Sequence, residues 1–153
     1  MRTKEMALSY LKRANSRLID ARSALKRGDI PDVIRYSQEA VEMSLKAVLR
    51  AVGIEYPKDH DVSDVLLACK ERLPEEILED MERLMRISSE LVDKRGPAMY
   101  GDEEAGIPAE ELFEKDDAEK ALKDANYVFE KCKSAITSFF GGIINSNLSL
   151  QPT

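Results

Sequence analysis

The sequence has no tryptophan, one histidine and two cysteines, and it holds only seven glycines and six prolines among 153 residues. Charged residues make up 34% and hydrophobic residues 43%, which argues against disorder and favours amphipathic helices with charged outer faces. The two cysteines, Cys69 and Cys132, are far apart and form no C-x-x-C pair. We therefore expect reduced, apolar cysteines rather than a disulfide scaffold.

Long apolar runs are also missing. No segment approaches the roughly 18 apolar residues of a membrane span, and the N-terminus lacks the apolar stretch of a signal peptide. We expect a cytoplasmic protein that does not enter a membrane.

Acidic residues are the minority in the first third of the chain, and basic residues are the minority in the rest. Residues 1–50 contain 11 Lys and Arg against 6 Asp and Glu, whereas residues 51–153 contain 12 against 23. The basic third fits a nucleic-acid footprint. The reading we favour is that Lys12, Arg13, Arg17, Arg22, Lys26 and Arg27 solvate one helix and attract the acidic remainder or a partner subunit.

Apolar residues recur at steps of three and four and predict an all-α chain. The expected helices cover 3–26, 31–52, 61–73, 74–94 and 116–139, and their boundaries are marked by Gly28, Gly53 and Pro74. Asp29 is expected to cap the second helix, and Asp116 with Glu119 to form a capping box for the last. The predicted fold is one domain, 1–142, an up-and-down bundle of four long or medium helices plus one short helix, with a flexible tail over 143–153.

The segment between the fourth and fifth expected helices has no helical period. Loops of this length are uncommon in compact domains and often functional. Pro97, Tyr100, Ile107 and Phe113 lie in it, so we expect an ordered loop laid against the bundle.

Several motifs in order resemble the HEPN family. They are the turn at 23–29, the Ala-rich helix Arg35–Arg50, the segment His60–Leu67, the loop Pro97–Pro108 and the helix start Asp116–Ala121. The loop is similar to that of a prokaryotic branch with an Ala-x-Tyr-Gly-Asp motif. The resemblance covers roughly residues 5–140.

This resemblance implies a four-helix core with an extra short helix, a homodimer, and partnership with a minimal nucleotidyltransferase in a toxin–antitoxin module. Many members are metal-independent RNases whose signature is Arg, a spacer of four to six residues, then His. Counted from Arg95, the positions that need His hold Tyr100, Gly101 and Asp102. We therefore expect a non-catalytic protein that binds nucleotide or RNA or regulates such a partner, without metal or cofactor. The alternatives are an endoribonuclease with a nonstandard site around Arg95 and a helical dimer scaffold without ligand.

Three residues of the predicted loop are candidates for the site. Arg95 either anchors a phosphate or satisfies the last carbonyls of the fourth helix. Tyr100 is a candidate for positioning or binding a nucleotide, and the resemblance makes it a candidate for nucleotidylation; the reading we favour packs its ring on the bundle. Asp102 belongs to an acidic run, Asp102–Glu104, that either holds Mg²⁺ near a nucleotide or, as we favour, is solvated.

His60 is the one histidine, in the turn before the third expected helix. The favoured reading gives it a part in the cap of that helix, with a metal ligand or a base as the other readings. Antiparallel third and fourth helices bring His60 toward Arg95. We hypothesise that His60 replaces the missing motif histidine.

Overall fold

The structure is a computed structural model that describes residues 2–56 and 58–141. It contains the helices α1 (Thr3–Arg27), α2 (Ile30–Ala51), α3 (Ser63–Ala68), α4 (Glu75–Glu79), α5 (Met81–Tyr100) and α6 (Lys115–Phe139), and the short 3₁₀ helices η1 (Lys70–Arg72) and η2 (Ala109–Glu111). No strand occurs in the described ranges, so the all-α prediction is confirmed. The predicted tail, 143–153, lies outside the described residues.

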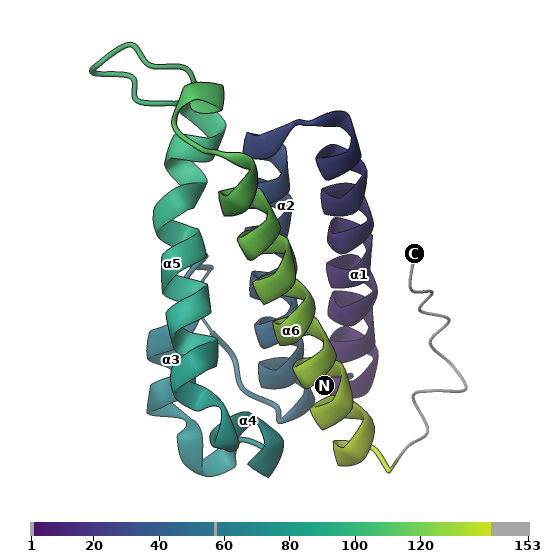
Figure 1. Ribbon diagram of the computed structural model, residues 1–153. Helices are drawn as coiled ribbons and strands as arrows, with labels where there is room; N and C mark the ends of the chain where they lie inside the picture. The colour runs from purple at the N-terminus through teal and green to yellow at the C-terminus, as the bar shows by residue number, and fades with distance from the viewer. Residues whose placement is uncertain (1, 57, 142–153) are drawn as a thin grey trace.

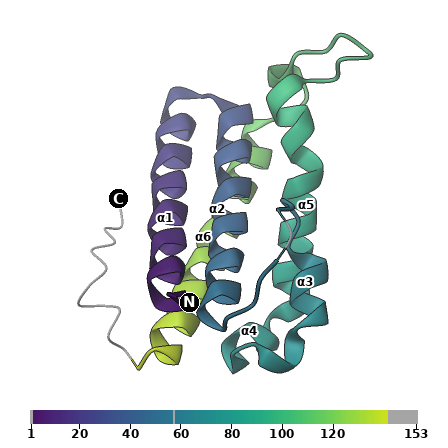
Figure 2. The ribbon, with the colours of Figure 1, turned by 180° about the vertical axis from the view of Figure 1, so that it is seen from behind.

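The four long helices α1, α2, α5 and α6 form an up-and-down bundle (Figure 1). Helix α2 packs against the other three, and its buried face runs its full length. Helices α3 and α4 lie at the end of the bundle where α2 ends and α5 begins. The view from behind shows the connection after α2 climbing between α2 and α5 before α3 descends (Figure 2).

The predicted apolar stripes form the core. On α1, Ala7, Leu11, Ala14, Leu18 and Ala21 are fully buried, and Ile34, Ser37, Val41, Leu45 and Val48 form the corresponding face of α2. On α6 the same holds for Ala121, Ala125, Val128, Cys132 and Ile136. Leu25 and Val52, near the ends of α1 and α2, are half-buried, and Phe139 is 50% exposed because it stands in the last turn of α6, beyond the main core.

Two predicted caps are wrong in detail. The Asp29 side chain does not cap α2; its Oδ2 accepts a hydrogen bond from Arg27 Nε at 2.8 Å. The capping box of α6 lies two residues before the predicted pair, where the Asp117 carboxylate accepts a bond from the Glu114 backbone N–H at 2.8 Å. Residues Asp116 and Glu119 therefore lie inside the helix.

The third and fourth expected helices are each divided. The third consists of α3 and η1, and the fourth is interrupted at Asp80. The Asp80 carboxylate accepts hydrogen bonds from Tyr127 Oη and Lys131 Nζ of α6, and these bonds lower its pKa. This anchorage to α6 fixes Asp80 in a non-helical conformation, with φ −115° and ψ 21°.

Helix α5 does not end near Lys94 as expected. It continues through Gly96 and Pro97 to Tyr100. Pro97 has no N–H to donate to the carbonyl of Asp93, but it lies in the last turn, where only one such bond is lost. Ala98 is buried against the bundle and holds this extra turn in place. Arg95 therefore belongs to a helix rather than to a loop.

A short hairpin follows α5 and projects from the end of the bundle (Figure 1). The backbones of Asp102 and Ile107 form two hydrogen bonds with each other across the hairpin, with N···O distances of 2.9 and 3.0 Å. The segment is ordered, as predicted, but residues 102–108 are exposed. The expectation that this loop lies against the bundle holds for its second part only: Ala109, Leu112 and Phe113, after the hairpin, are half-buried, and η2 contacts α5 and α2.

Within the described ranges, no helix combines the length and the apolar character that a bilayer crossing requires.

Candidate functional site

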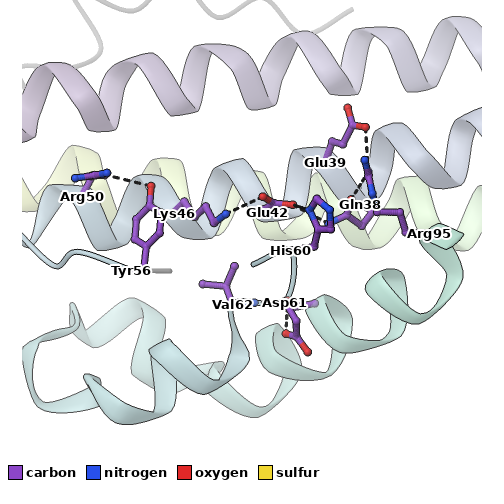
Figure 3. A network of polar contacts seen from close by, with 11 residues as sticks. Gln38, Glu39, Glu42, Lys46, Arg50, Tyr56, His60, Asp61, Val62 and Arg95 are labelled. Carbon is purple, nitrogen blue, oxygen red and sulfur yellow. Dashed lines mark hydrogen bonds and ion pairs between the residues drawn. The ribbon is translucent and has the colours of Figure 1, made fainter. Parts of the chain in front are cut away.

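The face of α2 that is turned toward α5 and the segment before α3 carries a row of connected polar side chains (Figure 3). Gln38, Glu42 and Lys46 are spaced four residues apart, so they follow one line along the helix. Arg95 Nη1 donates to Gln38 Oε1 at 2.7 Å, and Gln38 Nε2 donates to Glu42 Oε1 at 3.1 Å. His60 Nδ1 lies 2.7 Å from the same Glu42 oxygen, and Lys46 Nζ donates to the other at 2.7 Å. The row thus connects Arg95 to His60 through two side chains of α2.

Arg95 reaches this row from α5. Its Nη1 atom is also 3.0 Å from Glu39 Oε2, and its side chain is only 19% exposed. The guanidinium is therefore directed across to α2 rather than to the last carbonyls of α5, which belong to residues 97–100. Because a guanidinium has five N–H donors in a planar fork, these contacts leave donors for a ligand.

The position of His60 is set by its neighbour Asp61. The Asp61 Oδ1 atom accepts bonds from the Ser63 backbone N–H at 3.0 Å and from Ser88 Oγ of α5 at 3.0 Å, and Oδ2 accepts one from Ser89 Oγ at 3.0 Å. Burial alone would raise the pKa of Asp61, but the serine bonds outweigh it and lower the pKa. Asp61 therefore binds the first N–H of α3 and attaches the connecting segment to α5, which fixes His60 over α2.

Arg95 and His60 line one pocket of about 210 Å³ between α1, α2 and α5. The other lining residues are Arg13 and Arg17 of α1 and Glu39, Glu42 and Met43 of α2. Three guanidinium groups, an imidazole and two carboxylates thus line the same small pocket. Arg17 adds a buried Nε without a hydrogen-bond partner in the described part of the chain. Such a donor set suits a phosphate group.

The charge state of Glu42 follows from its contacts. Burial would raise the pKa of this carboxyl, but hydrogen bonds from Lys46, Gln38 and His60 outweigh burial and hold the pKa below its usual value. Glu42 is thus an anion that orients the His60 ring through Nδ1. The Nε2 atom of a histidine held in this way is free to serve a ligand.

Tyr100 and Asp102 lie apart from this pocket. Residues 95 and 100 of one helix differ by about 140° in direction, because successive residues turn by about 100°. Tyr100 is 65% exposed, so the favoured packing of its ring on the bundle is wrong. Asp102 Oδ1 accepts a bond from the Ala105 N–H at 3.1 Å inside the hairpin.

A second pocket, of about 500 Å³, separates the hairpin from α5. Pro97, Gly101, Leu112 and Phe113 supply its apolar lining, and Asp102, Glu103 and Glu104 its acidic rim. It shares no residue with the pocket at Arg95, so the predicted site is divided into two places. In residues 2–56 and 58–141, no three His, Cys, Asp or Glu side chains are grouped as metal ligands would be.

The sequence reasoning missed Arg13, Arg17, Glu39 and Glu42 as members of the site. The two arginines were assigned to a solvated helix face. Their spacing of four residues places them on one side of α1, and the spacing of three between the two glutamates does the same on α2. The sequence contains these pairs, but not the information that they face each other.

This geometry defines the class of the protein. It is an all-α bundle with an arginine-lined pocket between α1, α2 and α5. Residues 7–135 match the family model described as the HEPN domain, and the chain belongs to this family. A relative in Methanocaldococcus jannaschii, named "Putative toxin MJ1304", is 33% identical over 138 residues, covering 86% of this chain and 89% of the relative. No solved structure matches the chain. The resemblance seen in the motifs is thereby confirmed.

Proposed function

We propose that this HEPN protein acts in a toxin–antitoxin module by binding a phosphate group of RNA or of a nucleotide in the pocket of Arg13, Arg17, His60 and Arg95. The observation that carries this proposal is the convergence of these four side chains from three separate parts of the chain on one space. A phosphate oxygen accepts several charge-assisted hydrogen bonds, and the planar arginine fork fits it well.

The name of the relative supports the toxin–antitoxin setting, since that protein is called a toxin and aligns over most of both chains. In this proposal the chain works as a cytoplasmic homodimer and pairs with a minimal nucleotidyltransferase, as the family resemblance implies. The exposed Met99, Tyr100 and Ile107, 40%, 65% and 36% accessible, give the hairpin end of the bundle a surface for such a partner.

RNA cleavage is the second candidate function, and one observation favours it. His60 is oriented through Nδ1 by Glu42 and lines the pocket that also holds Arg95. In such a reaction, Nε2 of His60 accepts the proton of a 2′-hydroxyl, whose oxygen bonds to the adjacent phosphorus to form a 2′,3′-cyclic phosphate. The bond from phosphorus to the 5′-oxygen breaks, and the leaving oxygen takes up a proton from water. Arg95 would stabilise the charge on the phosphorane oxygens. We place binding first because the motif histidine is absent after Arg95.

The test uses the purified full chain with labelled RNA in EDTA, together with Arg95→Ala, His60→Asn and Tyr100→Phe variants. Binding without cleavage that weakens at least about tenfold in Arg95→Ala supports the first function. Cleavage that disappears in both Arg95→Ala and His60→Asn establishes the second. Wild-type protein whose melting temperature is shifted by neither RNA nor nucleotide would contradict both and favour the scaffold. Tyr100→Phe is the control outside the pocket.

The nucleotidyltransferase pairing has its own test. After co-expression of the chain with a minimal nucleotidyltransferase, co-purification and the mass of the Tyr100 peptide are measured. Co-purification is the expected result, and separate elution of the two proteins counts against the pairing.

A further inference from the structure

Three tyrosines on the α1–α2 side of the molecule each lie beside cationic groups. We infer that a single-stranded polynucleotide binds along this side, passing over the pocket with its bases on these tyrosine–cation pairs. The surface is named here the α1–α2 strip and consists of Tyr10, Arg13 and Arg17 of α1, Arg35, Tyr36 and Arg50 of α2, and Tyr56, with the buried Lys46 of α2 against the Tyr56 ring. The inference rests on the proposed phosphate site and adds the class of its ligand.

One end of the strip is built around Tyr36. The Arg35 guanidinium lies 4.5 Å from the centre of the Tyr36 ring, and the Arg17 guanidinium, from α1, lies 6.0 Å from it. Arg17 also lines the phosphate pocket, so this aromatic pair is directly adjacent to it. Tyr36 and both arginines are only half-buried, which leaves part of each planar group for a base.

The other end is built around Tyr56. Arg50 and Lys46 lie 4.9 and 5.2 Å from the centre of its ring, and Arg50 Nε donates to its hydroxyl at 3.3 Å (Figure 3). Tyr10 of α1 lies beside Tyr56, and the Arg13 guanidinium lies 5.8 Å from the Tyr10 ring. Arg13 lines the pocket too, so both aromatic ends connect to it through an arginine of α1.

The dimensions fit a short strand. Arg35 and Arg50 are fifteen residues apart on α2, which corresponds to about 22 Å at about 1.5 Å per residue. At roughly 3.4 Å per stacked nucleotide this length accommodates about six nucleotides, or fewer in a stretched strand. Sites of similar size on other proteins bind single strands by combining a basic groove with stacking on aromatic rings.

The local charge favours the same ligand. Arg13, Arg17, Arg35, Lys46, Arg50 and Arg95 lie on or beside the strip, and the carboxylates that accompany them are Asp20, Asp32, Glu39 and Glu42. The excess of these six cations over these four carboxylates is positive without counting His60, in a chain of net charge −6. A duplex keeps its bases paired and stacked, so it offers phosphates to the arginines but no base face to the tyrosines.

The experiment measures fluorescence anisotropy with a labelled twelve-nucleotide single-stranded RNA, the same sequence as DNA, and the RNA duplex. Inorganic pyrophosphate serves as a competitor for the pocket alone. Tyr36→Leu and Tyr56→Leu remove the rings, and the matched control is Tyr127→Leu, whose ring lies 3.6 Å below Arg83 but on α6, outside the strip. Melting temperatures verify that each variant is folded.

We expect the single strand to bind more tightly than the duplex, and each ring removal to weaken it at least about fivefold while competition by pyrophosphate is unchanged. Arg35→Gln and Arg50→Gln should each reduce the slope of log affinity against log salt by about one. Duplex binding as tight as single-strand binding, or wild-type affinity in both tyrosine variants, would overturn the inference. If Arg95→Ala leaves pyrophosphate competition intact, the phosphate pocket fails instead. The ratio of RNA to DNA affinity identifies which strand is preferred.

Discussion

Arg95 Nη1 of α5 lies 3.0 Å from Glu39 Oε2 of α2, and the two side chains are 19% and 20% exposed. The positive charge that suits this arginine to a phosphate is thus partly balanced by a carboxylate of the neighbouring helix. A phosphate that enters the pocket must compete with Glu39. Glu39 also lies 3.6 Å from Arg35, so it connects the pocket to the strip.

Replacement of Glu39 by glutamine should therefore strengthen anion binding. The amide keeps a hydrogen-bond acceptor for Arg95 but removes the competing charge, and we expect affinity for pyrophosphate or RNA to rise about three- to tenfold at low salt. Titration followed by anisotropy or calorimetry measures this change. Glu119→Gln, which removes an exposed partner of Lys115 on α6, is the charge-matched control. Equal gains in both variants would show that only net charge matters.

The bundle was predictable because its apolar stripes repeat with the helical period. Leu11, Leu18 and Leu45 are buried where the spacing of three and four places them. The break at Asp80 was not visible, because it depends on Tyr127 and Lys131, which lie about fifty residues further along the chain.

The end of α5 was misplaced for a different reason. Gly96 and Pro97 are ordinary signals for a helix end, but burial of Ala98 outweighs the single hydrogen bond that Pro97 loses. Arg95 stays a predicted site residue, and the structure adds the partners that hold its side chain. Its partners Gln38 and Glu39 are more than fifty residues away in sequence, so no local pattern could connect them.

Glu42 should make the free energy of unfolding fall at acidic pH. Its folded-state pKa lies below the ordinary value of 4.5, so the carboxylate contributes stability that is present above this value and is lost as the pH falls through the folded-state pKa. Glu42→Gln should cost about 2 kcal/mol at pH 7, since Lys46 then keeps a largely buried charge without a counter-ion.

The difference between wild type and Glu42→Gln should shrink as the pH is lowered toward 3, which urea unfolding at several pH values measures. Glu130→Gln, at an exposed position of α6, serves as control and should leave the pH profile unchanged. A constant difference from pH 7 to 3 would disagree with a lowered pKa for Glu42.

Asp61→Ala should reduce both stability and anion binding. The change removes the acceptor for the Ser63 N–H and for the hydroxyls of Ser88 and Ser89, so the start of α3 loses this hydrogen bond and its attachment to α5. We expect a loss of about 2–3 kcal/mol in the free energy of unfolding. Because His60 then loses its fixed position over α2, affinity for pyrophosphate should fall several-fold at temperatures where the variant is folded. Asp64→Ala, exposed in the same helix, should do neither.

Gly101→Ala should destabilise the end of α5 more than any other glycine change in the hairpin. Gly101 has φ 71° and ψ −161°, a region that is essentially restricted to glycine, and an added Cβ would lie 2.3 Å from the Ile107 carbonyl oxygen. The backbone strain and the overlap with the Ile107 carbonyl add to each other. We therefore expect the free energy of unfolding to fall by about 3 kcal/mol, or the hairpin to separate from α5. Urea unfolding measures the first and hydrogen exchange at the Asp102 and Ile107 amides the second.

Gly106→Ala is the matched control for this change. Gly106 has a similar φ of 69°, but nothing lies within 4 Å of its added Cβ, so only the strain of about 1 kcal/mol should appear. The difference between the two variants isolates the contact of Gly101 with Ile107. Because the pocket of Arg13, Arg17, His60 and Arg95 shares no residue with the hairpin, pyrophosphate affinity should be the same in both variants. Loss of that affinity in Gly101→Ala alone would mean that the end of α5 helps to position Arg95.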